Sequence, residues 1–130
     1  MRTIAQSVLI KASPHDVYEA LMDSKKHSEF TGSKAVISRK AGGQFVTWDG
    51  YAEGKNVILV PDSRIAQTWR ASDWPPGLYS YVRIKLDSIA SGTRLTFFQS
   101  DVPDKFKETI SKGWRDFYWT PLKRMLEAKE

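Results

Sequence analysis

The stretch that constrains the fold most is residues 110–125, ISKGWRDFYWTPLKRM, near the end of the chain. Its large side chains recur at the spacing of one helical face, namely at Ile110, Trp114, Phe117, Tyr118, Pro121, Leu122 and Met125. Proline has no backbone N–H, so Pro121 cannot bond to the carbonyl of Phe117, and we expect a kink or a local distortion there. A helical face this wide and aromatic needs a second layer to cover it.

The residues before this helix predict that layer. Short runs of strand-forming residues, separated by turn signals, predict strands at 35–39, 44–48, 51–60, 64–71, 79–87 and 93–100, and residues 3–10 begin the chain with another. Strands at this spacing describe an antiparallel meander. Gly54 lies inside one of these runs, which indicates a bulge or a close backbone approach.

Two short helices are expected between the first strand and the meander. Ser13 can cap a helix that has Pro14 at its first position, and Lys25 to Phe30 suits a second helix that ends at Gly32. We therefore predict an α+β fold, in which a curved antiparallel sheet of about six or seven strands surrounds a long C-terminal helix. A chain of 130 residues is one domain's worth of protein, so we expect residues 1–130 to form a single domain.

Composition and charge exclude several kinds of function. The chain contains no cysteine, which excludes disulfides, thiolate metal sites and a cysteine nucleophile. No apolar run approaches the ~20 residues of a membrane helix and no signal peptide is recognisable, so we expect a cytoplasmic monomer or weak dimer without a membrane partner. The net charge of +5 divides into +2, +2 and +1 over residues 1–50, 51–100 and 101–130. This even spread contains no basic arm, and we expect no nucleic-acid partner.

Residues suited to catalysis or metal binding are sparse. We expect His15 and His27 to lie on the solvated surface of the N-terminal helices, and no cluster of His, Asp and Glu has metal-ligand spacing. No metal and no cofactor is therefore expected. Asp49 and Glu53 are assigned to strands and are the candidate acid–base groups, although an outward-facing surface carboxylate is the more common state. Further candidates are Gln67, Gln99 and Tyr118. An enzymatic function is the less favoured interpretation.

The aromatic residues indicate a binding site. Alternation along the strands and the helical face direct a mixed set of aromatic and amide side chains into the space between sheet and helix. The predicted lining residues are Phe45, Thr47, Gln67, Trp69, Phe97, Gln99, Trp114, Phe117 and Tyr118. An apolar cavity with a few convergent polar groups is typical of a small-molecule site. A filled core is the alternative, and a cavity above ~300 Å³ would favour ligand binding.

Several short motifs follow one another in a characteristic order. They include Ser13-Pro14, Gly42-Gly43-Gln44-Phe45, Trp48-Asp49-Gly50-Tyr51, Leu59-Val60-Pro61, Trp69-Arg70, Asp73-Trp74-Pro75, Gly113-Trp114 and Phe117-Tyr118. The set resembles the C-terminal domain of the activators of heat-shock protein 90 ATPase, and the resemblance covers essentially the whole chain. It implies the helix-grip fold of the Bet v 1-like, START-like or SRPBCC group. Members of that group commonly hold hydrophobic ligands between the sheet and the helix.

Three functions remain open at this point. The favoured one is binding of a small hydrophobic ligand between the sheet and the C-terminal helix. The resemblance implies a second, a stress-response co-chaperone that stimulates a heat-shock protein 90 type ATPase, with an exposed loop at Trp74 and Pro75 as its interaction site. The third is an enzyme of the aromatase or dehydratase kind, as some relatives are. The resemblance implies that eukaryotic activators carry an additional N-terminal domain that provides most of the chaperone contact, and we do not expect that domain within these 130 residues.

Overall fold

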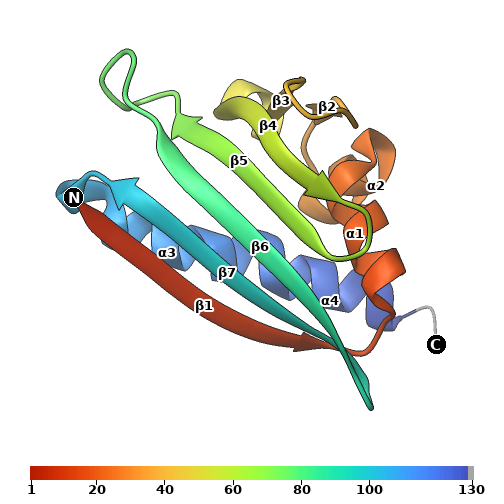
Figure 1. Cartoon of the computed structure of the whole chain (residues 1–130). Helices are drawn as coiled ribbons and strands as arrows, with labels where there is room; N and C mark the ends of the chain where they lie inside the picture. Colours follow the sequence, from red (N-terminus) through yellow and green to blue (C-terminus); the bar gives the residue numbers. More distant parts are fainter. Residues whose placement is uncertain (129–130) are drawn as a thin grey trace.

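The computed structural model describes residues 1–128, in which seven strands form one sheet in the order β1-β7-β6-β5-β4-β3-β2 (Figure 1). The strands are β1 Arg2–Ile10, β2 Val36–Ile37, β3 Gln44–Thr47, β4 Ala52–Val60, β5 Arg64–Ala71, β6 Ser80–Ile89 and β7 Gly92–Val102. Every neighbouring pair is antiparallel. Strands β2 to β7 therefore form the predicted meander, and β1 pairs with β7 at its end.

Two short helices follow β1, as predicted. Helix α1 spans Pro14–Met22, and α2 spans Ser24–Thr31. The hydroxyl of Ser13 accepts a hydrogen bond from the backbone N–H of Asp16 at 3.1 Å, which caps α1. Gly32 ends α2 with a φ of +74°, a left-handed conformation that glycine adopts without strain.

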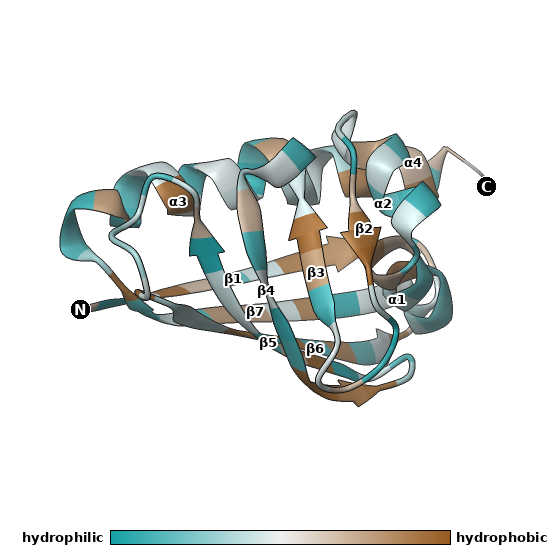
Figure 2. Ribbon diagram, turned by 90° about the horizontal axis from the view of Figure 1, so that it is seen from above, coloured by the Kyte–Doolittle hydropathy of each residue, from teal (hydrophilic) through white to brown (hydrophobic). Residues whose placement is uncertain are grey.

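The C-terminal helix lies across one face of the curved sheet (Figure 2). It begins with the 3-10 turn η2, Asp104–Phe106, and continues as α3 Lys107–Trp114, η3 Arg115–Trp119 and α4 Thr120–Glu127. Helices α1 and α2 pack beside α4 at one end of the sheet. The core fills the space that these elements enclose, and the expected α+β helix-grip architecture is confirmed.

The C-terminal helix contains the distortion expected near Pro121. Segment Arg115–Trp119 is a π-helical turn, in which the backbone N–H of Thr120 bonds to the carbonyl five residues earlier. Because a π turn holds one more residue than an α turn, the side chains that follow are rotated about the helix axis. Within the turn itself, Trp119 is buried, whereas Phe117, which a regular helix would direct inward, is 56% exposed.

Gly54 lies where two strand backbones approach closely, one of the two explanations that the sequence allowed. A Cβ atom at this position would lie 1.8 Å from the carbonyl oxygen of Thr68 on the neighbouring strand β5. The bulge of β4 lies further along, between Asn56 and Ile58, where the pairing register with β5 shifts. The inserted residue turns Ile58 toward the face of the sheet that the helix does not cover.

Candidate functional site

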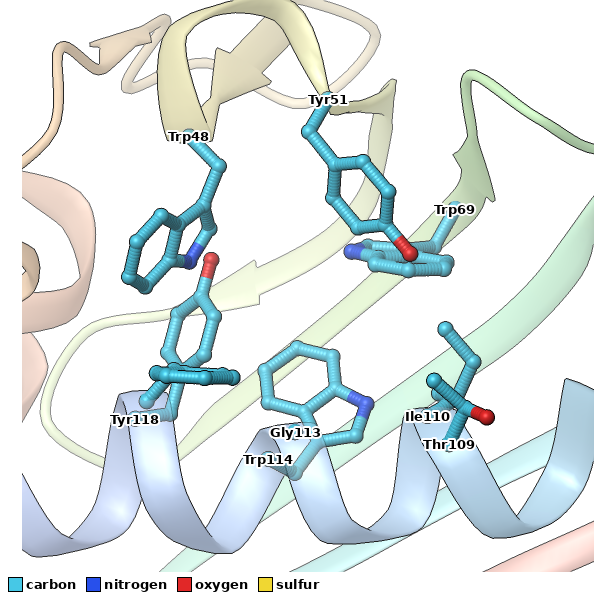
Figure 3. Close-up of a pocket in the computed structure, with 9 residues that line it drawn as sticks. Trp48, Tyr51, Trp69, Thr109, Ile110, Gly113, Trp114 and Tyr118 are labelled. Atoms are coloured by element: carbon cyan, nitrogen blue, oxygen red, sulfur yellow. The ribbon is translucent and has the colours of Figure 1, made fainter.

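A pocket of about 240 Å³ lies between the C-terminal helix and the turn that joins β3 to β4 (Figure 3). Aromatic rings form most of its walls. The lining residues are Trp48, Tyr51, Trp69, Thr109, Ile110, Gly113, Trp114, Phe117 and Tyr118. Phe117 and Tyr51 are both partly exposed, so the pocket opens to solvent beside them. An apolar concave site of this kind is where a hydrophobic molecule gains most from leaving water.

The turn η1, Trp48–Gly50, brings two aromatic rings to the pocket. Trp48 and Asp49 have φ values of +55° and +54°, a left-handed conformation that is uncommon for residues other than glycine. In Figure 3 the side chains of Trp48 and Tyr51 extend from this turn toward the helix. Asp49 lies in the turn and is exposed, so its assignment to a strand was wrong. The turn interrupts the alternation on which that assignment depended.

The hydroxyl of Tyr118 is the centre of a buried polar group beside the pocket. It lies 3.3 Å from Nε2 of His27 and 3.3 Å from Oγ1 of Thr47. Burial is the main cause that raises the pKa of Tyr118, while its hydrogen bonds to Thr47 and Trp48 act in the opposite direction. The phenol therefore stays neutral, and its contacts connect η3 to α2, β3 and η1.

His27 is buried, which corrects the expectation of a solvated position. Its side chain faces the core from α2 and packs against the rings of Phe30 and Tyr118. The carbonyl of Leu21, 3.0 Å from Nδ1, can only accept a hydrogen bond, so Nδ1 carries the ring proton and Nε2 can accept one from Tyr118. Burial lowers the pKa of His27 to about 4, and the imidazole is therefore neutral at physiological pH.

A second, smaller space of about 30 Å³ lies deeper in the core. Three of the predicted lining residues, Phe45, Thr47 and Gln67, border this space and not the larger pocket. Trp69, Trp114 and Tyr118 border both. A volume of this size is suited to one water molecule and is too small for an organic ligand.

Phe97 and Gln99, also predicted to line a cavity, are fully buried in the packed core and border neither space. Gln99 nevertheless positions Trp114, which forms part of the wall of the larger pocket. Its amide oxygen accepts a hydrogen bond from the indole N–H of Trp114 at 2.8 Å, and its amide nitrogen donates to Oγ of Ser80 at 2.9 Å. These bonds hold the Trp114 ring in one orientation, since breaking them would leave buried polar atoms unpaired.

Four of the nine predicted lining residues thus border the larger pocket: Trp69, Trp114, Phe117 and Tyr118. Sequence reasoning did not assign Trp48, Tyr51, Thr109, Ile110 and Gly113 to the site. Of these, Ile110 could have been assigned from its sequence position, because it begins the aromatic helical face. No sequence pattern indicates that Trp48 and Tyr51 point inward, because the turn that directs them contains two residues in an uncommon backbone conformation.

The loop after β5 differs from its expected form at Trp74. This side chain is only 3% exposed, because its ring stacks on Phe106 at 6.0 Å and meets Trp69 edge-on at 5.4 Å. The guanidinium of Arg70 donates to the carbonyl of Trp74 at 2.7 Å and holds the loop against the sheet. Trp74 is therefore not an exposed anchor, whereas Pro75 is exposed.

The two candidate carboxylates lie outside the pocket. Glu53 is exposed and forms an ion pair with Arg70 at 3.3 Å, and Asp49 is exposed in η1. Among residues 1–128, no group of three or more His, Cys, Asp or Glu side chains is arranged to hold a metal ion. In the same part of the chain, no helix has the length and apolar character needed to cross a membrane.

Comparisons with known proteins agree with this architecture. A family model described as "Activator of Hsp90 ATPase homolog 1-like protein" matches residues 11–127. The "Activator of 90 kDa heat shock protein ATPase homolog" of Dictyostelium discoideum is 31% identical over 116 residues, which are 88% of this chain and 30% of that protein. Homolog 1 from Mus musculus is 27% identical over 112 residues, 86% of this chain and 33% of that protein. The chain spans about a third of the length of these curated relatives.

Solved structures share the fold at lower sequence identity. An Hsp90 activator from Plasmodium falciparum superposes with a TM-score of 0.90 at 20% identity, covering 98% of this chain and 97% of that one. The Aha1 dimer from Colwellia psychrerythraea superposes with a TM-score of 0.84 at 21% identity, covering 98% and 97%. At these identities the likeness shows a common fold.

Proposed function

The chain belongs to the family of Activator of Hsp90 ATPase homolog 1-like proteins, and we propose that within this family it binds a small, flat, hydrophobic ligand in the aromatic pocket. The supporting observation is the arrangement of rings around one opening. Trp48 and Tyr51 face Trp114 across it, from elements that are far apart in the sequence. Such rings can sandwich a planar molecule, and Trp114 is held in the packed core while Trp48 packs against it.

The size and polarity of the pocket define the class of ligand. Apolar cavities of about 150 Å³ accept benzene, and drug-sized sites begin near 300 Å³. At about 240 Å³, this pocket is smaller than the ~300 Å³ named in the sequence analysis as favouring ligand binding, so it suits only a molecule of one or two fused rings or a short acyl chain. None of its described lining residues carries a charge, so burial of a charged ligand would be costly. The hydroxyls of Tyr51 and Thr109 border the pocket (Figure 3), and either can form a hydrogen bond with a polar substituent.

The decisive variant is Gly113→Leu, tested with the uncharged probe 2-naphthol. Gly113 lines the pocket from α3, and a Cβ atom there meets only Phe117, at an ordinary 3.9 Å. Replacing a helical glycine by leucine favours the helix by up to about 1 kcal/mol, while the longer side chain occupies the pocket. We expect native protein to bind 2-naphthol with a Kd on the order of 100 µM and the variant to bind at least about tenfold more weakly. Titrations followed by ¹H–¹⁵N NMR measure both.

The matched control is Lys112→Leu, which adds the same side chain at the neighbouring, exposed position of α3. It should bind 2-naphthol like the native protein. Thermal unfolding of both variants checks that any loss of binding does not come from unfolding. Equal binding by Gly113→Leu and native protein, or no resonance shifts near the pocket at millimolar probe, contradicts a ligand site at this position.

A second candidate function is suggested by the names of the matched relatives, which are activators of a 90 kDa heat shock protein ATPase. In this function the chain binds a chaperone of that class and raises its rate of ATP hydrolysis. We expect a measurable increase in the steady-state ATPase rate of the chaperone from the same organism at micromolar chain, in a coupled assay. If the chain neither stimulates the ATPase nor co-sediments with the chaperone at that concentration, this function is rejected. The proposal of ligand binding is not affected by that result.

A further inference from the structure

Within residues 1–128, no helix covers the outer face of the sheet. Figure 1 looks onto this face, with the C-terminal helix behind the strands, and no other helix of the described residues crosses in front of them. Side chains alternate between the two faces of each strand. In β5 the inward residues include Ile65 and Trp69, so Arg64 and Ala66 point outward. Pairing sets Ala66 opposite Arg83 of β6, and Arg83 opposite Phe98 of β7.

A shallow hollow of about 440 Å³ lies at the middle of this face. Ala66 forms its floor, because a methyl group leaves a depression between the longer side chains on either side. Ile58 borders one side, where the bulge in β4 directs it outward, and Phe98 borders the other. Ile58 is 40% exposed and Phe98 is 38% exposed, so solvent reaches the apolar walls of the hollow.

Three cations border the same hollow. Arg64, Arg83 and Lys85 come from two adjacent strands, with Arg64 directly opposite Lys85 in the register. All three are exposed, and none of the lining residues is a carboxylate. Within residues 1–128, the two arginines form no ion pair, and Lys85 has only a 3.8 Å contact with Asp87. Such an exposed pair is weak, so these charges are available to an incoming anion.

The combination of charge and apolar surface points to one class of partner. We propose that this outer face binds an acidic segment of a partner protein, with carboxylates on Arg64, Arg83 and Lys85 and an apolar side chain in the hollow over Ala66. Arginine recognises carboxylates through two parallel N–H donors, and Ile58 offers contact to an aliphatic neighbour. This site lies on the opposite side of the sheet from the ligand pocket and does not depend on it.

A protein partner fits the face better than a nucleic acid does. The guanidinium of Arg83 lies over the ring of Phe98, 5.5 Å from its centroid, and covers the surface on which a base would stack. Three cations are also few for nucleic-acid binding, which draws its strength from the release of counterions along many phosphates.

The test compares native protein with the double variant Arg64→Glu/Arg83→Glu. The probe is a peptide of about twelve residues that repeats the unit Glu-Glu-Leu. In ¹H–¹⁵N NMR titrations near 50 mM salt, we expect resonance shifts confined to the outward-facing residues of β5, β6 and β7. Charge reversal should weaken binding at least about tenfold, because attraction becomes repulsion. Raising the salt toward 500 mM should weaken binding by the native protein as well.

The matched control is Lys25→Glu/Lys26→Glu, which reverses an exposed basic pair on α2 and changes the net charge by the same amount. It should bind the peptide nearly as well as native protein. Thermal unfolding confirms that both double variants are folded. Three results overturn the proposal: no shifts at millimolar peptide, equal weakening by both double variants, or tighter binding of an oligothymidylate of similar length than of the peptide.

Discussion

At the scale of single residues, His27 shows how burial changes a side chain's chemistry. Its ring proton is committed to the carbonyl of Leu21, and its other nitrogen contacts the hydroxyl of Tyr118. Aromatic rings pack around it and, among residues 1–128, no carboxylate forms an ion pair with it, so a positive charge there would be poorly solvated. Folding therefore keeps the imidazole of His27 in its neutral form.

This state makes stability depend on pH. The unfolded chain binds a proton at His27 near pH 6.5, whereas the folded protein does so only near pH 4. Between these values the unfolded state holds more protons, so the free energy of unfolding decreases as the pH falls, by up to about 3 kcal/mol from this residue. In His27→Gln this contribution should disappear. Urea unfolding of native and variant protein at several pH values from 7 to 4.5 measures the difference in slope.

The control for this experiment is His15→Gln. His15 is exposed and lies 3.0 Å from Asp62 on the surface, whereas His27 is buried in the core. The slope against pH should change more in His27→Gln than in this variant. Parallel curves for native protein and His27→Gln would show that the buried imidazole does not control acid stability.

At the scale of elements, the C-terminal helix shows where periodicity succeeds and where it fails. Ile110 and Trp114 lie before the π turn and are buried, as the helical spacing predicted. Within the turn, Trp119 is inside and Phe117 is at the pocket rim, whereas Leu122 beyond the turn is buried as the spacing predicted. A regular 3.6-residue period cannot anticipate this exchange, because a π turn contains one more residue than the period assumes.

Strand pairing leaves no room for a side chain at Gly54. A side chain at this position would place its Cβ atom 1.8 Å from the Thr68 carbonyl oxygen, far inside contact distance, and the obstacle is backbone, which cannot rotate away. We expect Gly54→Ala to lower the free energy of unfolding by more than about 3 kcal/mol, because β4 and β5 must separate to admit one methyl group. Equilibrium urea denaturation measures this loss.

The same substitution in the helix is the control for Gly54→Ala. At Gly113 the added methyl group has room, and alanine favours a helix over glycine by up to about 1 kcal/mol. Gly113→Ala should therefore be neutral or stabilising. If the two alanine variants unfold at the same denaturant concentration, the close approach of β4 and β5 does not restrict position 54.

At the scale of the whole molecule, hydrogen bonds join the two ends of the chain. The amide of Gln6 in β1 accepts the indole N–H of Trp119 at 2.7 Å and donates to the carbonyl of Ser111 at 2.8 Å. The ammonium of Lys123 donates to the carbonyl of Leu9 at the end of the same strand. These contacts fix the helix on the sheet, and with it the width of the pocket that the two enclose.

The clustering of charged residues on the surface is also decided at the scale of the whole molecule. Along the sequence the net +5 is nearly even, and that evenness argues against a basic arm. Pairing in the sheet nevertheless places Arg64, Arg83 and Lys85 around one hollow. Residues 19 to 21 positions apart become neighbours because antiparallel register, and not sequence distance, decides which side chains meet.

The amino-acid sequence by itself determined the architecture of this protein. Alternation, turn signals, helix caps and the aromatic helical face are local properties, and together they predicted the order of strands and helices. Tertiary structure alone decided the size of that space, the inward direction of Trp48 and Tyr51, the burial of His27 and Trp74, and the convergence of the basic residues. These features arise from contacts between distant segments, whose backbone turns and register no single segment encodes.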